Sequence, residues 1–187
     1  MAGFGLRNAS NAFAGYNSGG LLEFKMVDSY ATPTFAGDPI ILNDTTGNAE
    51  RGAVAPVDTD GNVVGFAVGF RYVSTTDTPT WDQYYPASGG TEVYVFVTPA
   101  SKSNLLEVQG NATWAQNQLG VQCSLVTGAG STSTGNSGYV VANHTTTVVT
   151  GAVLIRGVKM DGVNENSATP ILYAQLVNGV SAFETGV

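Results

Sequence analysis

The fold class follows from one stretch, GTEVYVFVTP at residues 90–99. Its valines alternate with Tyr94 and Phe96, which gives the two-residue period of a β-strand. Both alternating sets are apolar, and a strand with two apolar faces is typically buried on both sides. We therefore expect residues 90–99 to form a central strand, or one that is covered on each face.

Similar short apolar runs lie on both sides of this strand, separated by turn signals about every ten residues. The pair Asp60 and Gly61, placed between two apolar runs, predicts a tight hairpin turn. No segment carries three turns of amphipathic helical period. We predict an all-β protein, an antiparallel β-barrel or β-sandwich with hairpin extensions and an extended N-terminal arm.

The length of 187 residues is typical of one domain with short extensions. Residues 1–20 are rich in Gly, Ala, Asn and Ser and sustain no period, so we expect an arm there. A single β domain is predicted over residues 21–178, followed by a C-terminal tail at 179–187. We expect the arm to contact a partner, and its deletion to leave the domain folded. The apolar residues of the arm that are candidates for this contact are Phe4, Leu6, Phe13 and Tyr16.

The charge content and the lengths of the apolar runs exclude two classes of partner, nucleic acids and membranes. Only 11% of the residues are charged, against about 25% in ordinary soluble domains. The net charge is −7 and no basic cluster occurs, so nucleic-acid binding is not expected. No apolar run approaches the roughly 18 residues that span a bilayer, and the N-terminus lacks a signal-peptide core, so no membrane contact is expected. A surface so poor in charge favours a protein that is covered by neighbours or lies outside cells.

No chemically reactive constellation is evident in the sequence. Cys123 alternates with polar neighbours and is interpreted as a buried residue on a strand. His144 is the only histidine, whereas a metal site or a catalytic triad needs several converging groups. The run from Asp58 to Asn62 lacks the twelfth-position Glu of a calcium loop. We therefore predict no enzyme activity, no cofactor and no metal site.

The densest aromatic stretch is FRYVSTTDTPTWDQYYPASGG, residues 70–90. It is interpreted as a hairpin whose turn contains Asp77 and Pro79. Packing within the hairpin is favoured, with Tyr72 opposite Trp81 or its neighbours as an aromatic pair. A contact with a neighbouring subunit and a sugar-binding platform remain as alternatives. The candidate interface residues of this hairpin are Tyr72, Trp81, Tyr84 and Tyr85.

The order of several motifs resembles one known family. The chain runs through VVGFAVGFRYV, WDQYYPA, EVYVFVTP, LLEVQGNATWAQNQLG and VLIRGVKMDGVNENSATPILYAQLVN. This series is similar to the capsid decoration, or cement, proteins of tailed bacteriophages over roughly residues 15–178. The segment TPASKSNLLEVQ departs from the family pattern, being slightly longer and containing Lys102.

The resemblance implies a β-barrel or sandwich subunit that docks on the outer surface of an icosahedral phage capsid. It implies the phage major capsid protein and further copies of itself, as a homotrimer, as partners. It implies a virion protein made in the cytoplasm of the host bacterium, without catalytic or cofactor residues. The alternative that we keep open is a carbohydrate-binding or host-receptor-binding β domain that uses the aromatic patch.

Overall fold

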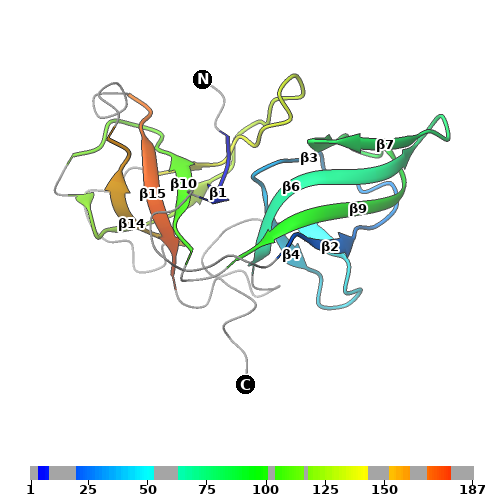
Figure 1. Ribbon diagram of the computed structural model, residues 1–187, viewed down its shortest axis with the longest axis horizontal. Helices are drawn as coiled ribbons and strands as arrows, with labels where there is room; N and C mark the ends of the chain where they lie inside the picture. The colour runs from blue at the N-terminus through cyan, green and yellow to red at the C-terminus, as the bar shows by residue number, and fades with distance from the viewer. Residues whose placement is uncertain are drawn as a thin grey trace.

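The computed structural model describes residues 4–8, 20–52, 63–100, 104–115, 118–142, 152–160 and 168–177 (Figure 1). The fold is all-β and is built from antiparallel sheets, as predicted, and it contains no closed barrel. The two larger sheets form two lobes that lie side by side (Figure 1). In the part of the chain that is described, no helix is both long and apolar enough to cross a membrane.

The first lobe is a six-stranded antiparallel sheet. Its strands follow the order β2-β9-β6-β4-β5, and β7 pairs with the far end of β6. A short pair, β3 with β8, lies beside it. The bounds are β2 (Leu22–Lys25), β3 (Thr34–Phe35), β4 (Pro39–Leu42), β5 (Ala49–Arg51), β6 (Val63–Ser74), β7 (Pro79–Asp82), β8 (Tyr84–Tyr85) and β9 (Gly90–Pro99).

The second lobe is a five-stranded antiparallel sheet in the order β1-β10-β15-β14-β11, accompanied by the pair β12-β13. Cys123 lies on β11 and is fully buried, as the sequence pattern predicted. The bounds are β1 (Arg7–Asn8), β10 (Leu106–Gln109), β11 (Gln122–Cys123), β12 (Leu125–Val126), β13 (Val140–Val141), β14 (Val153–Val158) and β15 (Ile171–Leu176).

Each lobe curves toward closure without reaching it. In the first lobe a single parallel bridge joins Met26, just after β2, to Ala49 on β5. In the second lobe a single parallel bridge joins Gly110, just after β10, to Val141 on β13. Neither isolated bridge closes a sheet on itself, so the described residues contain no closed barrel and are consistent with a β-sandwich.

β9 is central in its sheet, as predicted, with β2 on one side and β6 on the other. Its valines are fully buried against the concave side of the sheet. Tyr94 and Phe96 point to the opposite side, where they are only half-buried. We call this opposite side the outer face of the six-stranded sheet.

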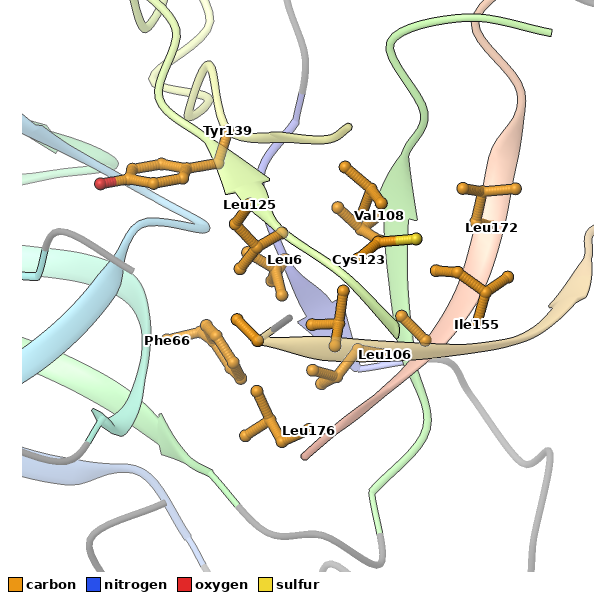
Figure 2. Close-up of a cluster of buried hydrophobic side chains, with 14 of the residues drawn as sticks. Leu6, Phe66, Leu106, Val108, Cys123, Leu125, Tyr139, Ile155, Leu172 and Leu176 are labelled. Carbon is orange, nitrogen blue, oxygen red and sulfur yellow. The ribbon is translucent and has the colours of Figure 1, made fainter. Parts of the chain in front are cut away.

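The outer face is covered over only part of its length. Phe66 on β6 pairs with Thr98 on β9 and belongs to the core of the second lobe. Figure 2 shows Phe66 reaching from the six-stranded sheet toward Leu106 and Leu176. Beyond Phe66, the same face carries exposed and half-buried side chains. The two lobes therefore share one core, and the sheet of the first lobe extends past it.

A second core fills the concave side of the six-stranded sheet. It contains the valines of β9, Phe70 and Tyr72 from β6, and Tyr85 from β8. Burying a large apolar side chain contributes roughly 1.5–3 kcal/mol, so each core can hold its own lobe together.

Residues 4–8 of the predicted N-terminal arm pack into the fold. Leu6 is 1% exposed in the shared core, and its amide donates a hydrogen bond to the Gly37 carbonyl at 3.0 Å. Arg7 pairs with Glu107 both in strand register and by an ion pair of 2.7 Å. The predicted hairpin at Asp60 and Gly61 and the tail at 179–187 lie outside the described residues.

A buried polar cluster around Asp38 ties the two lobes together. Its carboxylate, fully buried, accepts hydrogen bonds from the Phe35 amide at 2.9 Å and from the Ser137 hydroxyl at 2.5 Å. Arg51 completes the cluster with an ion pair of 2.7 Å. Burial raises the pKa of Asp38 above its ordinary value of 3.8, although the three partners oppose this rise. Because Ser137 leads into β13, the cluster connects the first lobe to the second.

Candidate functional site

The structure separates the four aromatic residues of the 70–90 hairpin. Tyr72 and Tyr85 are buried and meet edge to face, with ring centroids 5.2 Å apart. Tyr84 stacks on Phe35 at 5.7 Å, across the short β3-β8 pair. Packing within the hairpin, the preferred interpretation, therefore describes Tyr72 and Tyr85, whereas Tyr84 packs on Phe35 outside the hairpin.

Trp81 differs from the other three aromatics because it is 67% exposed. In register it lies opposite Arg71, while Tyr72 lies opposite Thr80, so Trp81 and Tyr72 point to different faces. The predicted pairing of Tyr72 with Trp81 itself does not form. Alternation along β6 and β7 explains this, because residues one apart on a strand face opposite ways.

Trp81 lies on the outer face and stacks on Phe96. The two ring centroids are 5.4 Å apart and the ring planes differ by only 12°. The strands involved, β7 and β9, are separated by β6. Gly69 on β6 is the register partner of Phe96 and has no side chain. The result is a flat aromatic surface that is held in place from two strands.

Arg71 makes a second diagonal contact on the same face. Its guanidinium lies 4.2 Å from the ring centroid of Tyr94 and reaches Glu23 on β2, with an ion pair of 2.7 Å. The hydrogen bond that Arg71 donates to the Glu23 carboxylate raises the pKa of Arg71 above its ordinary value, so Arg71 stays charged. We call Glu23, Arg71, Trp81, Tyr94 and Phe96 together the outer aromatic patch.

A second candidate surface follows β2, which is an edge strand of its sheet within the described chain. Leu21 is 54% exposed, Leu22 36% and Val27 41%. Exposed large apolar side chains on a strand edge favour pairing with another chain. We call residues 21–27 the apolar edge.

A small pocket lies where the second lobe stops covering the outer face. It has a volume of about 230 Å³, and Arg7 at its margin lies over the Phe4 ring at 4.2 Å. Leu6 and Phe66, both buried, form part of its lining, and the exposed Val68 also lines it. The pocket thus separates the shared core from the outer aromatic patch.

Of the residues that the sequence suggested as candidates in the N-terminal segment, only Phe4 and Leu6 are among those that the structure describes. Phe4 is half-buried beside the pocket, and Leu6 is in the core, so neither stands on an open arm. Phe13, Tyr16 and His144 lie outside the described residues. Among the residues that are described, no three His, Cys, Asp or Glu side chains gather in a way that could hold a metal ion. The outer aromatic patch is suited to binding a partner by ring stacking, and the apolar edge is suited to binding one by burial of its apolar side chains.

Sequence reasoning missed four members of the outer aromatic patch: Glu23, Arg71, Tyr94 and Phe96. The alternation in residues 90–99 placed Tyr94 and Phe96 on one face, which was a usable signal. Their meeting with Trp81 depends on strand register, which the sequence alone does not reveal.

Comparison of the chain with protein-family models, with curated proteins and with solved structures found no match.

Proposed function

We propose that this chain is a non-catalytic structural protein that decorates and cements the outer surface of a phage capsid. In this role it bridges neighbouring major capsid protein subunits.

The proposal agrees with the motif order of the chain and with the all-β fold that this resemblance implies.

The observation that carries the proposal is the apolar edge. Of the seven large apolar side chains that are exposed among the described residues, three fall within residues 21–27. The seven are Leu21, Leu22, Val27, Val68, Trp81, Val126 and Met160. Such a concentration on one short segment supports a contact with another protein chain.

The backbone at the apolar edge adds a second means of attachment. β2 is hydrogen-bonded to β9 on one side, and the isolated bridge at Met26 occupies one point near its other side. An extended segment of a partner could pair with this edge while its side chains cover Leu21 and Val27. In a trimeric assembly, three such contacts would act together, and the high effective concentration would make attachment much tighter than one contact alone.

The proposal is tested with capsids that lack the protein and with purified protein added back. Val27 and Val126 are matched, because both are 41% exposed valines, one at the apolar edge and one on β12. We expect Val27→Lys to weaken co-sedimentation with capsids by about tenfold or more, since a charge must then be buried in the contact. Val126→Lys should bind as the unmodified protein does.

Thermal unfolding of both variants serves as the control for folding, because exposed substitutions normally change stability by less than about 0.5 kcal/mol. If Val27→Lys and Val126→Lys bind capsids equally well, the apolar edge is not the contact. If the unmodified protein does not bind capsids at all, the proposed function is wrong.

A further inference from the structure

We propose that the outer aromatic patch is a binding site for an uncharged sugar in its pyranose form. This inference goes beyond the proposed function and does not rest on it, because the aromatic rings of the patch stand on β7 and β9, and only Glu23 of the patch lies within the apolar edge. On β2, Glu23 points to the outer face, whereas Leu22 lies opposite Val97 on the other side of the sheet.

The first requirement for sugar binding is an exposed, flat and immobile aromatic ring. Trp81 is 67% exposed, and its ring lies within 12° of the plane of Phe96. One side of a pyranose presents C–H groups, which are apolar and pack on an aromatic face. Because Phe96 already holds the indole, little side-chain freedom is lost when a ligand binds.

The second requirement is a set of polar groups beside the ring that can bind hydroxyls. The Arg71 guanidinium lies 5.9 Å from the Trp81 centroid and is fixed by Tyr94 on one side and by Glu23 on the other. The pair offers N–H donors and a carboxylate acceptor in one place, and hydroxyl groups can use both. Such a small number of placed polar groups next to apolar surface is typical of ligand sites.

The charges on the patch favour a neutral ligand. The positive charge of Arg71 is matched by Glu23 at 2.7 Å, so an acidic ligand would have to compete with a carboxylate that is already in place. Lys25, which lies opposite Tyr94 in register, is exposed and can add a donor at the margin. A neutral polyhydroxyl ligand uses all of these groups without breaking the ion pair.

The experiment follows the indole N–H resonances of the protein by NMR. The chain has two tryptophans, and Trp114 is buried while Trp81 is exposed, so the two signals report on different places. Methyl glycosides of glucose, galactose, mannose and N-acetylglucosamine, and their short oligosaccharides, are titrated into the millimolar range. We expect at least one of them to shift the Trp81 resonance in a saturable way and to leave that of Trp114 unchanged.

Three variants make the test specific. Trp81→Ala should lower the affinity for the sugar found by about tenfold or more, whereas Trp81→Phe should keep part of it, since a smaller ring remains. Glu23→Gln should weaken binding, because it releases Arg71 from its fixed position. Met160→Ala, which changes an exposed residue on the other lobe, should bind as the unmodified protein does.

The proposal is overturned if no sugar in the panel shifts the Trp81 resonance, or if Trp81→Ala binds as tightly as the unmodified protein. It is also overturned if methyl glucuronide, an acidic sugar titrated in the same way, binds and no neutral sugar does. If no sugar binds and Trp81→Ala loses attachment to capsids, the patch is a protein contact instead. The sugar titrations need no capsid, so their result does not depend on whether the apolar edge binds one.

Discussion

Trp81 and Phe96 stack across an intervening strand, with their ring centroids 5.4 Å apart. Gly69, on β6 between them, is the register partner of Phe96 and carries no side chain on this face. Arg71 crosses β9 in the same manner to reach Glu23. These two diagonal contacts tie together the four strands β7, β6, β9 and β2. The exposed end of the six-stranded sheet is thus stabilised by side-chain contacts on its outer face as well as by the apolar core on its other side.

Replacement of Gly69 by valine should separate Trp81 from Phe96. A Cβ at this position would lie 3.3 Å from the Asp82 carbonyl oxygen. We expect the two methyl groups of valine, which extend further over the outer face, to push the indole away from Phe96. We expect a loss of roughly 0.5–1.5 kcal/mol in the free energy of unfolding from the stacked pair. Denaturant unfolding measures this, and the cost of Gly69→Val should be smaller in a Trp81→Ala background. Equal costs in the two backgrounds would show that the rings do not interact.

Replacement of Leu6 by alanine should destabilise the whole protein. The Leu6 side chain is buried in the core that both lobes share, so its truncation leaves a cavity there. The expected cost is about 2–5 kcal/mol in the free energy of unfolding, measured by denaturant titration. Leu21→Ala is the matched control, because Leu21 is 54% exposed and should change stability by less than about 0.5 kcal/mol. A Leu6 variant as stable as the control would place residues 4–8 outside the fold.

Asp38 should make the protein less stable as the pH rises through its titration range. Burial raises the pKa of Asp38 in the folded state above the ordinary value of 3.8. Between these two pKa values the folded protein binds more protons than the unfolded one, so the free energy of unfolding falls with rising pH. Ionised Asp38 therefore lowers the free energy of unfolding. This destabilisation is fully present above the pKa of Asp38 in the folded protein and is absent below 3.8.

The measurement is the free energy of unfolding against pH for the unmodified protein and for Asp38→Asn. In Asp38→Asn the free energy of unfolding should not fall in this way. The difference between the two curves should therefore change as the pH rises from 3.8 through the pKa of Asp38 in the folded protein. Asp44→Asn, at an exposed turn, controls for the loss of one negative charge. Parallel curves for the unmodified protein and Asp38→Asn would contradict the assigned role of burial.

The fold class and the central strand could be predicted because alternation is a local property. Residues 90–99 carry it clearly, and they form β9 between two neighbours. The outer aromatic patch could not be predicted, since it depends on which residues face each other across four strands. Register shifts between Ala67 and Gly69, and again between Arg71 and Val73, decide that alignment. An extra residue on one strand reverses the faces beyond it, and the sequence does not mark such bulges.

The burial of residues 4–8 was missed for a different reason. Their composition resembles a flexible arm, and they are too few to show a period. Gly5 has a φ of 70°, and a Cβ there would collide with the backbone of Gly37. The glycine that suggested flexibility is therefore needed for a close approach of two backbone segments. A glycine in a flexible segment and a glycine at a close backbone contact look alike in the sequence, and only the contact of Gly5 with Gly37 distinguishes them.

Counting the copies of this chain in purified virions shows whether it decorates a capsid. Quantitative mass spectrometry of the particles gives the ratio of this chain to the major capsid protein. We expect a ratio of the same order as one, because a cementing protein must occupy repeated sites over the whole shell. Virions that lack the chain, or that carry only a few copies of it, would rule out the proposed role.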